Sequence, residues 1–144
     1  MIPQPHITIL PSGLAILEED YTVRVWPVTV SISAGFAYDG ASIPALAQPF
    51  VGGPFDPRRL PAATVHDWLY ASHRLPRWIA DMVFLVLLLF TGLLPIWRCI
   101  VDWWAVARYG RAAWDSHGPE EQTIRRRQGA VKLFSNPKKG QINE

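Results

Sequence analysis

Apolar and polar residues alternate with a period of two over residues 4–36, which predicts short β-strands. The alternating runs lie at residues 7–9, 14–16, 21–25 and 28–32. Turn residues separate them at Pro11-Ser12-Gly13 and Glu18-Glu19-Asp20, and Pro27 favours an edge or a bulge. A small antiparallel sheet follows from this pattern.

From Pro61 onward the apolar spacing becomes helical. We expect three main helices, over residues 62–72, 77–90 and 96–114, with breaks at residues 74–76 and at Gly92–Pro95. Glu120 to Leu133 predicts a further short basic helix. Prolines and glycines crowd residues 37–59 among apolar anchors, which favours a long ordered loop.

These elements predict an α+β fold, in which a small N-terminal antiparallel sheet and a long loop precede a bundle of three main helices. A chain of 144 residues fits one domain. We expect that domain at 1–134, with the β part at 4–36, the loop at 37–59 and the helical part at 60–134. Residues 135–144 form a polar tail.

The composition is apolar for a domain of this size, with 49% hydrophobic residues, 18% charged residues and seven tryptophans. Such a surface needs covering by a partner, a membrane or a second copy. Residues 82–101 approach the ~20 residues that span a bilayer. Gly92 and Pro95 interrupt them, so we predict two core helices, with a membrane-inserted hairpin as the alternative. Cys99 lies in this segment, and we expect it in the core.

The net charge is only +2, but the basic residues are distributed unevenly along the chain. More than half of the 14 lysines and arginines follow residue 107, which suits an acidic surface such as nucleic acid or anionic lipid, or simply a solvated tail. The start, Met1-Ile2-Pro3-Gln4-Pro5, lacks the basic and apolar stretches of a secretory signal.

Candidate chemistry is concentrated in His66-Asp67-Trp68-Leu69-Tyr70 and in Asp81. On a helix, His66 and Tyr70 share a face, and Asp67 lies about 100° around it. We predict His66 as a general base, Asp67 as a ligand for a hard cation such as calcium, and Asp81 on the next antiparallel helix as the group that orients His66. Tyr70 can donate to the same carboxylate.

A second motif, Tyr38-Asp39-Gly40-Ala41-Ser42-Ile43-Pro44, precedes the first. Asp39 is either a turn cap or a second cation ligand beside His66. Ser42 either bonds its own backbone or serves as nucleophile or oxyanion donor. A structural clasp, in which His66 bonds Asp81 or Asp39 and locks the loop to the helices, remains the alternative to a catalytic site. The tryptophans at 97, 103, 104 and 114 indicate core or interface.

The order His-Asp-x-x-Tyr, followed by an aspartate on the next helix, resembles the active-site helices of secreted calcium-dependent phospholipases, over residues 66–85. The resemblance implies that His66 activates water, Asp67 holds calcium, and Asp81 with Tyr70 orients His66. Those enzymes are rich in disulfides, whereas this chain has one cysteine.

A wider resemblance covers residues 15–114. The series Tyr-Asp-Gly-Ala-Ser-Ile-Pro, Val-His-Asp-Trp-Leu-Tyr, Ala-Asp-Met-Val-Phe and Arg-Tyr-Gly is similar to a family of uncharacterised proteins of tailed phages and prophages. It implies a phage origin and a small α+β domain, with the phage virion or the host cytoplasm or envelope as the location.

Three hypotheses follow. The protein is a metal-dependent hydrolase of ester or related bonds in the host envelope, a non-catalytic virion or tail component, or a membrane-active lysis accessory. The expected partners are other virion proteins or a second copy through the tryptophan-rich helices, and lipid. Nucleic acid is not expected as a partner, apart from the basic C-terminal segment.

Overall fold

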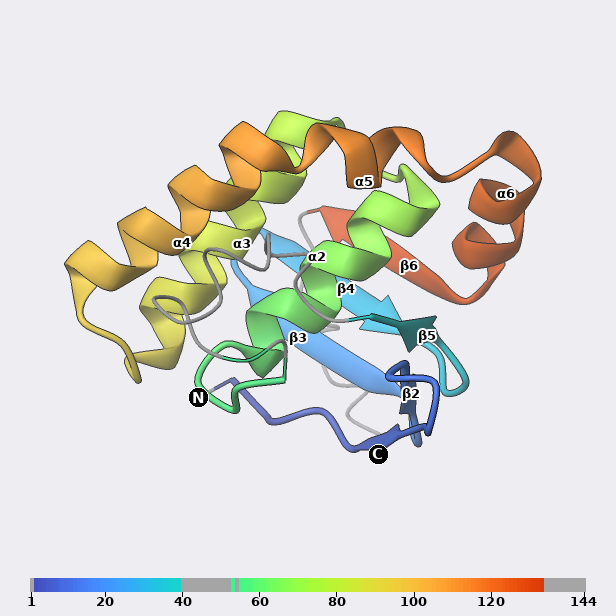
Figure 1. The fold of residues 1–144 in the computed structure, drawn as a ribbon, viewed down its shortest axis with the longest axis horizontal. Helices are drawn as coiled ribbons and strands as arrows, with labels where there is room; N and C mark the ends of the chain where they lie inside the picture. The colour runs from blue at the N-terminus through green and yellow to red at the C-terminus, as the bar shows by residue number, and fades with distance from the viewer. Residues whose placement is uncertain (1, 40–52, 54, 134–144) are drawn as a thin grey trace, which may run out of the picture.

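Two small antiparallel sheets and a set of helices make up the protein (Figure 1). The computed structural model describes residues 2–39, 53 and 55–133. The first sheet has the order β1-β2-β5 and the second the order β3-β4-β6. The strands are β1 (Ile7–Ile9), β2 (Ala15–Leu17), β3 (Tyr21–Val25), β4 (Val28–Ile32), β5 (Ala37–Tyr38) and β6 (Gly129–Leu133). The predicted α+β class is confirmed.

The period-two pattern explains β3, because Tyr21 and Val23 are buried while Thr22 and Arg24 are exposed. Trp26 and Pro27 connect β3 to β4, which pairs with it from Val28 to Ile32. The four predicted strands are thus confirmed, with β2 beginning one residue later than its pattern.

One prediction was wrong at the C-terminal side: residues 129–133 form a strand, not the end of a helix. Helix α6 spans Pro119–Arg127, and β6 then pairs antiparallel with the free edge of β4. Gly129 suits this close approach, since a Cβ atom there would lie 2.8 Å from the Trp68 ring. The second sheet therefore joins the last described strand to the β3–β4 hairpin.

The three main helices are α2 (Leu60–Ser72), α3 (Arg77–Thr91) and α4 (Ile96–Tyr109), followed by the short α5 (Arg111–Asp115). The third ends before the predicted Trp114, at Gly110. Helix α2 is central: it contacts α3, α5, α6, β4 and β5, and each of its residues except Asp67 is buried. Figure 1 shows α3 and α4 on the side of α2 away from α6.

The corner between α3 and α4 forms where the sequence predicted a break. Gly92 ends α3 with a positive φ of 64°, and Pro95 precedes α4. Cys99 is fully buried, as predicted, and its Sγ donates to the Leu94 carbonyl at 3.9 Å. None of the helices in the described ranges combines the length and apolarity that crossing a bilayer requires.

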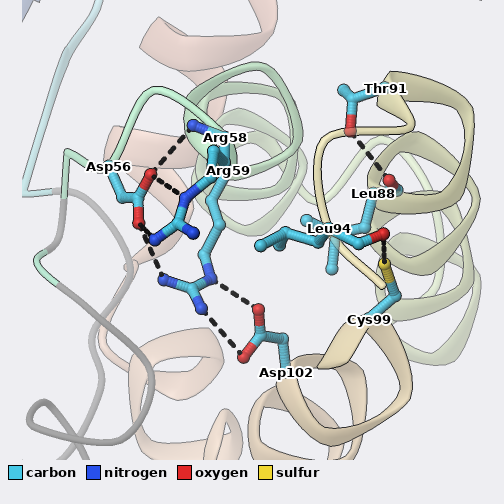
Figure 2. A network of polar contacts seen from close by, with 8 residues as sticks. All are labelled: Asp56, Arg58, Arg59, Leu88, Thr91, Leu94, Cys99 and Asp102. Carbon is cyan, nitrogen blue, oxygen red and sulfur yellow. Dashed lines mark hydrogen bonds and ion pairs between the residues drawn. The ribbon is translucent and has the colours of Figure 1, made fainter. Parts of the chain in front are cut away.

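A buried ion pair ties the start of α2 to α4 (Figure 2). Arg59 Nε donates to Asp102 Oδ2 at 2.5 Å, and both residues are almost fully buried. Asp56 lies on the other side of the same guanidinium, 3.4 Å from Arg59 Nη1, and also accepts from exposed Arg58. Burial raises the pKa of Asp102, whereas the Arg59 hydrogen bond lowers it.

We expect Arg59→Met to destabilise the protein by about 3–5 kcal/mol, because it leaves the Asp102 carboxylate buried without its cation. The double variant Arg59→Met/Asp102→Leu should recover most of that loss, since no charge then remains to be buried. Urea unfolding measures both. Arg58→Met, at the exposed neighbour, is the matched control and should lose far less stability, because it removes only the surface ion pair with Asp56. A loss there equal to that of Arg59→Met would contradict the assignment.

Candidate functional site

His66, Tyr70 and Asp81 meet between α2 and α3, as predicted. His66 Nε2 lies 2.9 Å from Asp81 Oδ1, and Tyr70 Oη donates to the same oxygen at 2.6 Å. The short turn after α2 makes the two helices antiparallel neighbours, which brings Asp81 back opposite the histidine. With Nε2–H donating to Asp81, Nδ1 is the ring nitrogen left for chemistry.

These three groups are buried, and the pKa values of His66 and Tyr70 are both raised. Burial by itself would lower the pKa of His66, but the negative charges of Asp67 and Asp81 and the hydrogen bond to Asp81 outweigh it and raise that pKa above its usual value. Burial, together with the hydrogen bond and charge of Asp81, raises the pKa of the Tyr70 phenol. Tyr70 therefore remains a hydrogen-bond donor over the whole physiological range.

Asp67 is the part-exposed residue of α2, and it has no such pairing. Its Oδ1 lies 3.8 Å from His66 Nδ1, beyond hydrogen-bond distance, and its buried Oδ2 has no hydrogen-bond partner among the described residues. Burial raises the pKa of Asp67 to about 6; His66 lowers it, and the charge of Asp39 raises it further. A carboxyl that titrates near neutrality can exchange protons under physiological conditions.

Asp67 lines a cavity of about 290 Å³. Its walls come from β5, α2 and the α5–α6 region, and they include Asp39, Asp67 and Tyr70. The structure thus places both predicted cation ligands on one cavity. His66 does not line this cavity: it is 5% exposed and lies behind Asp67 and Tyr70.

The sequence reasoning missed the opposite wall, which His117, Glu121 and Arg125 form. Glu121 lies 3.2 Å from His117 Nδ1 and 3.8 Å from Arg125 Nη2, and the Arg125 guanidinium stacks on Phe36 at 5.2 Å. The i, i+4 spacing of these three residues, of which Glu121 and Arg125 lie on α6, gave a local signal, but nothing local indicated that α6 returns to α2. The cavity therefore carries both signs of charge.

Tyr38 contributes a second missed contact. Its hydroxyl lies 2.7 Å from Thr64 Oγ1 and so fixes β5 against α2. The pKa of Tyr38 is raised to about 12. Burial is the main cause; the Thr64 hydrogen bond partly offsets it, and the Asp67 charge adds to it. This contact holds the segment that carries Asp39 at the cavity. Ser42, the predicted nucleophile or oxyanion donor, lies outside the described residues.

Calcium takes six to eight oxygen ligands. The described part of the cavity offers the carboxylates of Asp39, Asp67 and Glu121, and no group of three His, Cys, Asp or Glu side chains within the described ranges lies close enough to hold a metal ion. These residues by themselves do not fit a calcium site.

Gly110, at the end of α4, lies close to Tyr70. A Cβ atom at this position would lie 2.6 Å from the Tyr70 hydroxyl. Glycine therefore lets the α4–α5 junction approach the group that donates to Asp81. The Arg-Tyr-Gly step is in this way part of the support of the site.

The match to a family model covers residues 15–106 and bears the description "Protein of unknown function (DUF1353)". The chain belongs to this family.

Two curated proteins of Sinorhizobium fredii are similar to parts of the chain. Uncharacterized protein y4iH is 54% identical over 35 residues, which cover 24% of this chain and 15% of that protein. Uncharacterized protein y4jT is 33% identical over 85 residues, or 59% of this chain and 24% of that protein. The chain thus matches less than a quarter of either relative's length. No solved structure matches it.

We expect Asp67→Asn to stabilise the protein at pH 7.5, by at most about 3 kcal/mol, since a pKa raised by about two units costs 1.36 kcal/mol per unit. The folded state binds the Asp67 proton more tightly than the unfolded state. Parental stability therefore falls as pH rises from about 4 through 6, and the variant lacks this fall. Urea unfolding between pH 4.5 and 7.5 measures the difference.

Asp56→Asn is the matched control, because the Arg58 hydrogen bond lowers the pKa of Asp56. Its ionised form stabilises the folded state above the unfolded pKa, so this variant should lose stability at pH 7.5. A loss of stability in Asp67→Asn as well would show that the Asp67 carboxylate supports the fold.

Proposed function

We propose that this protein is a hydrolase of ester or related bonds, with His66 as its general base. The observation that carries the proposal is the shared acceptor: Asp81 Oδ1 receives hydrogen bonds from both His66 Nε2 and Tyr70 Oη. This arrangement fixes the ring, holds one tautomer and aims Nδ1 at the side of Asp67.

In the proposed reaction, a water molecule at the inner end of the cavity lies against the Asp67 carboxylate and gives its proton to His66 Nδ1 as its oxygen attacks the carbonyl carbon. Asp81 stabilises the imidazolium that forms. The bond to the leaving alcohol then breaks, and His66 returns the proton to the alcohol oxygen. Arg125 on the opposite wall supplies positive charge toward the developing oxyanion.

A role in the host envelope and a phage origin stay predictions from the sequence motifs, and so does calcium. The non-catalytic clasp is the second candidate. It is favoured by one observation, the 5% exposure of His66 behind the cavity wall. In a clasp, the hydrogen bonds to Asp81 serve only to hold α2 against α3.

We expect the purified protein to hydrolyse p-nitrophenyl butyrate or a short-chain phosphatidylglycerol, and His66→Gln to lower kcat by about 10²–10⁴. The base must be neutral, and its pKa is raised. The rate should therefore increase with pH through a value above the usual 6.5 of histidine. In Asp81→Asn this increase of the rate with pH should occur at lower pH, because the carboxylate that favours the protonated ring is gone.

His6→Gln, at an exposed histidine on the first sheet's side, is the control and should keep the parental rate. Repeating the assay with calcium and with EDTA decides the metal question: loss in EDTA assigns a cation to the cavity, and survival assigns the chemistry to the side chains. If the folded parent hydrolyses neither substrate, or if His66→Gln keeps the rate, the clasp is the correct assignment.

A further inference from the structure

Helix α4 presents an apolar face to solvent. Ile96, Trp97, Ile100, Val101 and Trp104 are all exposed, and we call them the α4 face. Their spacing of three and four residues places them on one side of the helix. The opposite side, with Cys99 and Asp102, is buried against the core.

The apolar surface continues around the corner between α3 and α4. Phe90, at the end of α3, is 67% exposed, and Leu93 in the connection is 52% exposed. Trp97 and Trp104 on the α4 face are 62% and 55% exposed. Contiguous apolar patches of this kind are uncommon on soluble monomers and mark contact surfaces. Figure 1 shows α4 along the outside of the molecule, away from α6 and β6.

The exposed charge on this part of the chain is cationic. Between residues 82 and 110 the charged side chains are Arg98, Asp102 and Arg108. Asp102 is buried and paired with Arg59, and Arg98 is half-buried, so Arg108 is the exposed charge of this stretch. Arg98 lies over the Trp97 ring at 5.8 Å, and Arg108 over the Tyr109 ring at 5.4 Å.

Two arginines lie near the C-terminal end of α4. Arg77, from the start of α3, donates to the Ala107 carbonyl at 3.1 Å. Arg108 is exposed beside Tyr109. An apolar helix face that carries tryptophan and tyrosine beside arginine is typical of helices that lie at the headgroup level of a bilayer.

We propose that the α4 face and its corner bind the surface of an anionic lipid bilayer, with α4 lying in the plane of the interface. Arg108 reaches the lipid phosphates, and the tryptophans enter the boundary with the acyl chains. A second copy fits less well, because two such faces bring two Arg108 side chains to one interface without an exposed carboxylate of residues 82–110 to pair with them. The proposal does not depend on His66 being catalytic.

Co-sedimentation of the full chain with vesicles of phosphatidylcholine, with and without phosphatidylglycerol, tests this proposal. The parent should bind the phosphatidylglycerol vesicles more tightly, and added salt should weaken that binding. The double variant Trp97→Ala/Trp104→Ala should bind at least about tenfold more weakly, and Arg108→Gln about fivefold more weakly. Ile100→Gln, an independent change on the same face, should also weaken binding.

Trp26→Ala and Trp78→Ala are the matched controls, because both tryptophans are exposed outside the α4 face. They should bind as the parent does, and circular dichroism should show every variant folded. Unchanged binding in the double variant, or equal binding to both kinds of vesicle, would overturn the proposal. A parent that sediments as a dimer while the double variant sediments as a monomer would also overturn it, since the face would then join two copies.

Discussion

The carboxylate of Asp81 holds the two central helices in register. It lies almost fully buried between α2 and α3, where an ionised group is costly unless donors surround it. Both donors come from α2, one turn apart, and both reach the same oxygen. The contact therefore sets the rotation of α2 and of α3 about their axes. Helix α4 packs on α3, and Trp68 of α2 packs under β6, so the sheet and the outer helix follow from this one arrangement.

The sequence predicted what depends on neighbours along the chain. Alternation in residues 21–25 and 28–32 needs only a two-residue turn to become a hairpin, and the His66–Asp81 contact needs only a short connection between two helices. The elements that it missed depend on distant segments. Strand β6 forms because β4 leaves an edge open, and Arg59 meets Asp102 across 43 positions. No local spacing encodes either contact, nor the return of α6 to the cavity.

Helix α4 shows how a distant contact changes the meaning of a pattern. The sequence predicts core or interface for the tryptophans at 97, 103, 104 and 114, which leaves open which side of α4 is buried. Arg59 decides this, because its guanidinium makes burial of Asp102 possible. With Asp102 and Cys99 facing inward, Trp97 and Trp104 must face outward. The ion pair at the start of α2 thus determines which side of α4 meets solvent, and with it the existence of the α4 face.

The difference between Asp67 and Asp81 is the physical argument for the proposed catalytic site over a clasp. A clasp requires the hydrogen bonds to Asp81 and nothing more, and α2 would be complete with an apolar residue at position 67. Asp67 instead lies at the cavity wall, too far from His66 Nδ1 for a hydrogen bond, and burial opposes its ionisation. At neutral pH its charge therefore costs folding free energy that the described contacts do not return. A group kept at a cost to the fold, next to a histidine held in one tautomer, has the energetic character of a site shaped for chemistry.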